Sequence, residues 1–322
     1  MSKEAIIEYL GSDWVRMKEI MSASLSSEVA LLDNLNSNIM SNSGKMLRPM
    51  IALLVCHALG KPNEDSLRFA AAAEMLHNAT LMHDDVADMS VERRGKPTLY
   101  SILGPTAAVL VGDFWLSKTV EVVYGCDRRT EAVSLFTKTM TDLSEGEMLQ
   151  MEKAEKADTD ESDYLKIIYG KTASLFVAAA SSAAISVGAP EELVESVRQY
   201  AKCVGIAFQI KDDILDYAGT PELGKPVGID LLEQKITLPL LGALKGSDRE
   251  SEIRAMVRNI GECPGNCGEI RRFVLKNSGI EYATARLEQY VNEAVRALDP
   301  VPDSYAKEAL KAIAKFNSYR QV

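Results

Sequence analysis

Hydrophobic residues recur along this chain at helical spacing, and no convincing series of alternating strand positions accompanies them. The pattern predicts helices over residues 3–21, 25–41, 64–90, 105–124, 129–156, 161–170, 171–187, 191–217, 235–246, 249–260, 266–277, 279–298 and 303–320. A further helix has Pro49 in its first turn and runs to Leu59, where Gly60 and Pro62 end it. The chain therefore has the pattern of an all-α protein.

No long linker rich in Pro, Gly or Ser divides the helices. The predicted helix over residues 64–90 is unusually rich in Ala, which permits close packing against neighbouring helices and leaves space for another molecule. We therefore expect one all-helical domain over residues 1–322.

Composition narrows the class of protein. The chain has 322 residues, 47% hydrophobic and 25% charged, with a net charge of -10, which argues against a nucleic-acid partner. An odd number of cysteines, three of them in apolar helical sequence, is expected of a reduced cytosolic protein. These are Cys56, Cys126, Cys203, Cys263 and Cys267. Cys263 and Cys267 flank Pro-Gly-Asn, so a metal knuckle or a disulfide stays open there.

Targeting and membrane signals are weak. The first residues carry acids where a signal peptide needs a basic and then an apolar stretch. No uncharged apolar run of roughly eighteen residues occurs, so no transmembrane helix is predicted. The most apolar stretch, Thr172–Pro190, is rich in Ala and Ser and is interpreted as a buried core helix. We expect a cytoplasmic protein without an integral membrane segment.

Two matching acidic triplets carry the chemistry: Asp84-Asp85-Val86-Ala87-Asp88 and Asp212-Asp213-Ile214-Leu215-Asp216. Acids at i and i+4 share one helix face, where they repel unless a cation lies between them. Carboxylate oxygens favour Mg²⁺, which completes its shell with water and substrate phosphate. A single triplet is more often a solvated acidic helix end, but two in the same setting indicate a diphosphate site. If both act on one diphosphate, they must face each other across one cavity.

Basic residues follow each triplet. Arg93 and Arg94 come after the first, where they either pair with its carboxylates or bind phosphate oxygens through their planar guanidinium groups. After the second comes a Gly- and Pro-rich loop over residues 219–230, which contains Lys225 and is followed by Lys235. Such a loop beside a metal site is a plausible lid over bound phosphate.

With these residues assembled, the chain resembles the trans-isoprenyl (polyprenyl) diphosphate synthase family, most of all its medium- and long-chain members such as octaprenyl diphosphate synthases. The resemblance is carried by His77 to Arg94, Gly112-Asp113, Gly146-Glu147 to Gln150, Lys171-Thr172, Phe208-Gln209 to Asp216, Gly224-Lys225, Lys235 and the early Gly44-Lys45-x-x-Arg48-Pro49. These motifs span nearly the whole chain in the family's order, so as a set they are highly specific.

The resemblance implies an all-α, isoprenoid synthase-type helical bundle around a central cavity. It implies a Mg²⁺-dependent, head-to-tail condensation of isopentenyl diphosphate with an allylic diphosphate, with about three ions per active site. The metal residues it implies are Asp84, Asp85 and Asp88, and Asp212, with Asp213 and Asp216 in the shell through water. The residues implied for the allylic diphosphate are Arg93, Lys171, Lys225 and Lys235, supported by Thr172 and Gln209. Those implied for isopentenyl diphosphate are Lys45, Arg48, His77 and Arg94.

Product length depends on the helix before Asp84. In short-chain members a bulky aromatic residue about one turn back forms a floor, whereas Ala79 and Thr80 are small here and Leu76 lies deeper. We expect a medium-to-long all-trans product, such as a quinone side-chain precursor. The alternative is that small residues only permit tight helix packing and that the product is farnesyl or geranylgeranyl diphosphate.

Other classes fit less well. A terpene cyclase uses similar metals but needs no isopentenyl diphosphate site, and a non-catalytic partner subunit of a heteromeric synthase characteristically loses one acidic motif. The family resemblance further implies a homodimer. A long product would be membrane-soluble, which is compatible with transient membrane contact on product release.

Overall fold

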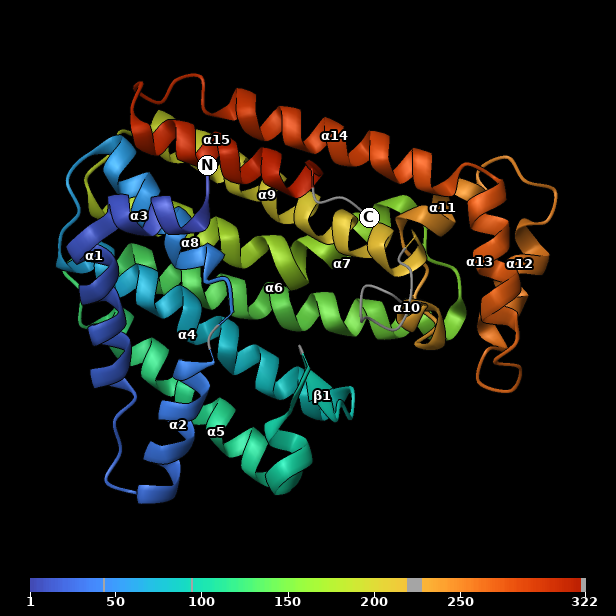
Figure 1. The fold of residues 1–322 in the computed structure, drawn as a ribbon, viewed down its shortest axis with the longest axis horizontal. Coiled ribbons are helices and arrows are strands. Elements are labelled where there is room, and N and C mark those ends of the chain that lie inside the picture. The colour runs from blue at the N-terminus through green and yellow to red at the C-terminus, as the bar shows by residue number, and fades with distance from the viewer. Residues whose placement is uncertain (43, 94, 219–227, 320–322) are drawn as a thin grey trace. The chain divides into compact units, whose positions relative to one another are not determined.

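The computed structural model describes residues 1–42, 44–93, 95–218 and 228–319 (Figure 1). The helices are α1 (Lys3–Ser24), α2 (Ala30–Ser41), α3 (Leu47–Leu59), α4 (Glu64–Ala87), α5 (Leu99–Tyr124), α6 (Arg129–Lys156), α7 (Glu161–Ile168), the π-helix η1 (Tyr169–Ala173), α8 (Ser174–Ser186), α9 (Glu191–Ala218), α10 (Ile229–Leu232), α11 (Leu238–Leu244), α12 (Glu250–Arg258), α13 (Asn266–Lys276), α14 (Gly279–Ala297) and α15 (Tyr305–Tyr319). Strands β1 (Glu92–Arg93) and β2 (Lys96–Pro97) form an antiparallel hairpin. The predicted all-α fold is confirmed.

Most predicted helices are confirmed, and the differences have local causes. Helix α5 begins at Leu99, before the predicted start, but Gly104 has a φ of 80° and Pro105 lacks an N–H, so the helix is kinked there. The predicted break at Gly95 is the turn of the β1–β2 hairpin, whose strands are too short to show alternation. The short helix α10 and the π-helix η1 were not predicted, because neither is long enough to show a helical period.

Two compact units make up the chain. The first comprises Met1–Thr137, Ala178–Arg198 and Val301–Leu310, and the second comprises Lys138–Val177, Gln199–Pro300 and Lys311–Val322. The division falls within helices α6, α8, α9 and α15. The expectation of a single domain around one central cavity stays a prediction.

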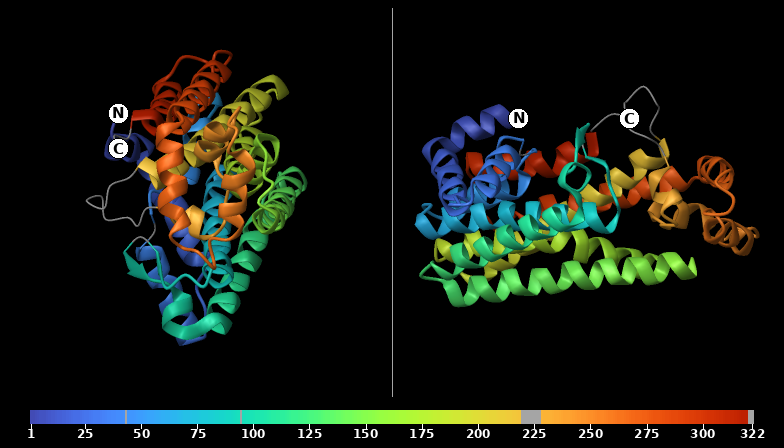
Figure 2. Two further views of the ribbon diagram at one scale, coloured as in Figure 1. Left: turned by 90° about the vertical axis from the view of Figure 1, so that its right-hand side faces the viewer. Right: turned by 90° about the horizontal axis from the view of Figure 1, so that it is seen from below.

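Helix α4 is the core of the first unit and packs against α1, α3 and α5 (Figures 1 and 2). Its residues from Phe69 to Leu76 are all buried, so the helix is enclosed on every side. A capping box formed by Asn63 and Ser66 fixes its start. The Ser66 hydroxyl also lies 2.7 Å from the Ser186 hydroxyl, which joins the beginning of α4 to the end of α8.

The second unit is built around α11, which packs against α7, α13 and α14. Helices α12 and α13 lie side by side in Figure 1 and are in contact. One apolar core joins the four helices α10, α11, α12 and α13, with Leu231 and Leu240 fully buried. A second core joins α7, α9 and α14 and includes Tyr164 and Ile210. These cores position the ends of α7 and α9, where the candidate site residues of this unit lie.

Two helical stretches of the described chain are long and apolar enough to cross a membrane by length and composition alone, although the sequence predicted none. They are Leu99–Tyr124 and Glu161–Ser186. The most apolar window of Glu161–Ser186 is 89% buried, as expected of the core helix predicted over Thr172–Pro190. The corresponding window of Leu99–Tyr124 is only 22% buried, so α5 presents an unusually apolar exposed face.

Candidate active site

The first acidic triplet lies at the C-terminal end of α4. The helix ends at Ala87 with Asp88 as its C-cap, and its last turn, described in full, holds no basic residue. Carboxylates are disfavoured at this end of a helix, because the unpaired carbonyl groups give it partial negative charge. Asp84 and Asp88 are at least partly exposed. This end of α4 therefore favours a bound cation.

Arg93 contacts the buried member of this triplet. Its Nε donates to Asp85 Oδ1 at 2.7 Å, and Asp85 is only 6% exposed. Burial raises the pKa of Asp85 above its ordinary value, while Arg93 opposes that rise. The β1–β2 hairpin brings Arg93 back to the helix end, and Thr98 secures it by donating to the carbonyl oxygen of Ser90 at 2.6 Å. Arg93 therefore pairs with the triplet, which was one of the two alternatives for the arginines. Arg94 lies outside the described residues.

Three of the residues expected to bind isopentenyl diphosphate are described, and they belong to the first unit. Lys45 is exposed just before α3, and Arg48 is partly buried in the first turn of that helix. His77 is partly buried on α4, seven residues before Asp84, so the two share one helix face. Their function in binding stays a prediction.

A contact between α4 and α5 supports the same helix end. His83 Nε2 lies 3.2 Å from Asp113 Oδ1, and a Cβ on Gly112 would come within 2.4 Å of that His83 nitrogen. A side chain at this position would require the imidazole to shift. The motif Gly112-Asp113 was recognised in the sequence, but its partner on α4 was not, since the pairing depends on how the two helices pack.

The residues expected to control product length lie deeper along α4. Leu76 is fully buried and Ala79 is 1% exposed, while Thr80 is partly buried and donates to the carbonyl oxygen of His77 at 2.9 Å. The positions are therefore inside the unit rather than on its surface. Their effect on product length stays a prediction.

The second acidic triplet repeats this arrangement at the C-terminal end of α9. The last turn of that helix, also described in full, contains no basic residue. Asp213 is 2% exposed and accepts hydrogen bonds from Tyr164 Oη at 2.6 Å and from Gln209 Nε2 at 2.9 Å. Gln209 Oε1 in turn accepts from Thr172 Oγ1 at 2.9 Å. Burial and then the nearby Asp230 raise the pKa of Asp213 well above its ordinary value, and the two hydrogen bonds oppose this.

Lys171 is presented by the π-helix η1. Its Nζ lies 2.5 Å from Glu147 Oε2 and donates to Gln150 Oε1 at 3.0 Å, so the predicted Gly146-Glu147 to Gln150 motif holds this lysine. A Cβ on Gly170 would come within 2.4 Å of the carbonyl oxygen of Asp142, which shows how closely η1 approaches α6. Short π-helical segments are frequent at functional sites, and this one fixes the direction of Lys171.

The segment after the second triplet brings two further charged residues to the site. Asp230 lies on α10, and Lys235 follows it and is ion-paired with Glu233. Burial and then the nearby Asp216 raise the pKa of Asp230 to about 6. Lys225, together with Gly224, lies outside the described residues. The sequence analysis gave no function to Asp230, the last residue of the loop over residues 219–230. It also gave none to Tyr164, for which no local sequence signal exists.

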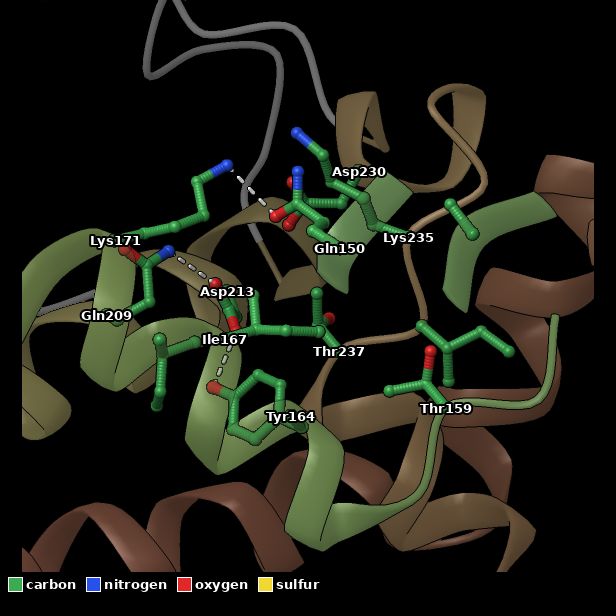
Figure 3. Close-up of a pocket in the computed structure, with 13 residues that line it drawn as sticks. Gln150, Thr159, Tyr164, Ile167, Lys171, Gln209, Asp213, Asp230, Lys235 and Thr237 are labelled. Atoms are coloured by element: carbon green, nitrogen blue, oxygen red, sulfur yellow. Dashed lines mark hydrogen bonds between the residues drawn. The ribbon is translucent and has the colours of Figure 1, made fainter. Parts of the chain in front are cut away.

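Side chains from these elements line a cavity of about 130 Å³ in the second unit (Figure 3). The close-up shows Asp213 between Gln209 and Tyr164, and Lys171 pointing toward Gln150. The residues that line this cavity are Gln150, Ala154, Thr159, Tyr164, Ile167, Ile168, Lys171, Gln209, Asp213, Asp230, Lys235, Ile236 and Thr237. Across the described residues, no three His, Cys, Asp or Glu side chains converge into a ready-made metal site. The donors that fit Mg²⁺ are instead carboxylates grouped at two helix ends.

Comparison with known proteins decides the family. The sequence profile described as "Polyprenyl synthetase" matches residues 29–274. The chain belongs to the polyprenyl synthetase family. Enzymes of this family are magnesium-dependent prenyltransferases that use isoprenyl diphosphate substrates, and the predicted enzyme class is confirmed.

Three relatives illustrate the similarity. An all-trans-nonaprenyl-diphosphate synthase (geranyl-diphosphate specific) of Rhodobacter capsulatus is 37% identical over 96% of this chain and 95% of its own. An octaprenyl diphosphate synthase of Escherichia coli is 36% identical over 98% of each chain. The crystal structure of a polyprenyl synthase from Caulobacter crescentus, complexed with calcium and isoprenyl diphosphate, is 32% identical. It superposes with a TM-score of 0.90 over 100% of this chain and 98% of that one.

Proposed function

We propose that this chain is an all-trans polyprenyl diphosphate synthase that condenses isopentenyl diphosphate head to tail with an allylic diphosphate. The observation that carries the proposal is the repeated placement of three carboxylates at a helix end without a basic residue, once on α4 and once on α9. That placement is unfavourable by itself and becomes favourable when divalent cations and a diphosphate are present. Relatives named as octaprenyl and nonaprenyl synthases support the same reaction.

The chain's own residues bind and orient the two substrates. Asp84, Asp88 and Asp212 would hold Mg²⁺ ions, about three in number, which would neutralise the negative charge on the leaving diphosphate. Lys171 and Lys235 add fixed positive charge near that diphosphate, and Lys171 is held for this purpose by Glu147 and Gln150. The allylic carbon–oxygen bond ionises, and the double bond of isopentenyl diphosphate attacks the resulting carbocation. A proton is then lost to the departing pyrophosphate, so no side-chain nucleophile is required.

We assign isopentenyl diphosphate to the other set of basic residues. Lys45, Arg48 and His77 would bind its diphosphate, since they lie near the beginning of α3 and on the α4 face that carries Asp84. Arg94, which lies outside the described residues, would join them. Arg93 contributes to the allylic site once a metal ion competes for Asp85. A terpene cyclase would not need this second basic set.

Product length follows from the interior of the first unit. Ala79 and Leu76 are buried on α4, and the residues from Ala70 to Ala73 below them are small and fully buried. We propose that the growing chain extends along this helix and reaches medium-to-long length, as a quinone side-chain precursor would require. A short farnesyl or geranylgeranyl product is the alternative.

The exposed face of α5 and the free cysteines bear on assembly and location. Helix α5 exposes Ile102, Leu110, Val120 and Tyr124, which we propose pack against a second copy to form a homodimer. All five cysteines are free in the described structure, which agrees with a reduced cytoplasmic protein. Release of a long apolar product would bring transient membrane contact.

One incubation tests the reaction. The purified chain is supplied with isopentenyl diphosphate, a labelled allylic primer and Mg²⁺, and product length is read by chromatography. We expect medium-to-long prenyl diphosphates from the wild type and almost none from Asp84→Ala or Asp212→Ala. A folded wild-type chain that forms no condensation product would refute the proposal. It would favour a non-catalytic partner subunit, whereas products made from the primer alone would favour a cyclase.

A further inference from the structure

Asp216 binds backbone atoms that follow it in the chain. Its Oδ1 accepts the N–H of Ile229 at 3.1 Å and its Oδ2 accepts the N–H of Asp230 at 3.3 Å. Its own carbonyl oxygen accepts the N–H of Gly228 at 3.1 Å, where a φ of 83° requires glycine-like freedom. Both carboxylate oxygens are thus engaged by the protein, and three hydrogen bonds join the end of α9 to residues 228–230.

The joined segment carries two charged residues of the site. Asp230 lines the cavity, and its carbonyl oxygen accepts the N–H of Lys235 at 2.8 Å. Leu231, between them, is fully buried in the apolar core and limits how the segment moves. The Asp216 carboxylate therefore restrains the backbone that carries Asp230 and Lys235.

We infer that Asp216 is a positioning residue, which holds the segment bearing Asp230 and Lys235 against the end of α9. The inference rests on the proposed function only for its effect on catalysis. Each carboxylate oxygen accepts one backbone N–H and keeps a second lone pair, so this positioning task is separate from any contact with the metal shell. A carboxylate that accepts two such bonds is stabilised where it is.

Amide hydrogen exchange on the metal-free protein tests the contact without any turnover. We expect the amides of Ile229, Asp230 and Lys235 to exchange about tenfold faster in Asp216→Ala than in the wild type, because local opening loses its main restraint. Asp216→Asn keeps one acceptor oxygen, so the exchange rates of these amides should lie between those of Asp216→Ala and the wild type. Asp212→Ala is the matched control and should leave these amides unchanged.

Kinetics then tests the effect on the reaction. If Asp216 positions Lys235, Asp216→Ala raises the KM for the allylic diphosphate and leaves the KM for isopentenyl diphosphate unchanged, with Asp216→Asn partly rescued. Unchanged exchange in Asp216→Ala, with a raised Mg²⁺ concentration for half-maximal rate, would show that Asp216 serves only the metal shell and would overturn the inference. An inactive wild type with the expected exchange pattern would refute only the proposed function.

Discussion

Removing the Tyr164 hydroxyl should destabilise the second unit and disturb its acidic triplet. Tyr164 and Asp213 are each 2% exposed, so their 2.6 Å hydrogen bond is shielded from bulk solvent. Tyr164→Phe leaves Asp213 Oδ2 without its donor, which costs about 2 kcal/mol for a buried carboxylate that retains only Gln209. The measurement is urea-induced unfolding of the metal-free protein, with the condensation rate at saturating Mg²⁺ as a second readout.

Tyr282→Phe is the matched control. Tyr282 Oη also donates to a carboxylate at 2.6 Å, that of Glu161, but the Glu161 side chain is 31% exposed and also pairs with Arg286. Water can replace the lost hydroxyl there, so the expected cost is below about 1 kcal/mol. The condensation rate of this variant should be close to that of the wild type.

The pH dependence gives a further check on Tyr164→Phe. The pKa of Asp213 is raised above 3.8 in the folded protein, so the folded state binds more protons than the unfolded state between 3.8 and the raised pKa. Stability therefore falls as pH rises through that window, and losing the hydroxyl raises this pKa further. The destabilisation by Tyr164→Phe should grow as pH rises through that window and should be smallest at acid pH, where Asp213 is protonated in both proteins. Equal losses in the two Tyr→Phe variants, or a loss that grows toward acid pH, would refute the reasoning.

Three further substitutions test other parts of the site. Asp230→Asn should stabilise the metal-free protein by up to about 2 kcal/mol at about pH 8, because it removes a buried carboxylate whose pKa is raised to about 6. The gain should vanish below about pH 4, and urea-induced unfolding at both pH values measures it. Gly112→Ala should displace the His83 imidazole from Asp113, because its Cβ would lie 2.4 Å from His83 Nε2; an unchanged NMR signal of the His83 ring would contradict this contact. Ala79→Phe should shorten the product, because Ala79 is 1% exposed inside the first unit; a folded, active variant with unchanged product length would refute the proposed tunnel along α4.

The sequence by itself determined the helices and most of the candidate residues. Helical periodicity is local, so α6 was predicted with its observed bounds, and Gly60 ended α3 where expected. The two acidic triplets were also readable, because residues at i and i+4 must share a helix face whatever surrounds them. The order of basic motifs along the chain indicated the family before any contact was known.

Only the tertiary structure decided which carboxylates hold other parts of the protein. Nothing near Asp213 in sequence indicates that Tyr164, on another helix, donates to it, or that Asp216 binds the backbone of Ile229. The π-helix at Lys171 likewise depends on Gly170 approaching α6, a contact between residues distant in the chain. Local pattern fixes the direction of a side chain relative to its own helix, whereas its hydrogen-bond partner depends on how separate helices pack. The two triplets are alike in sequence, and packing alone distinguishes their members.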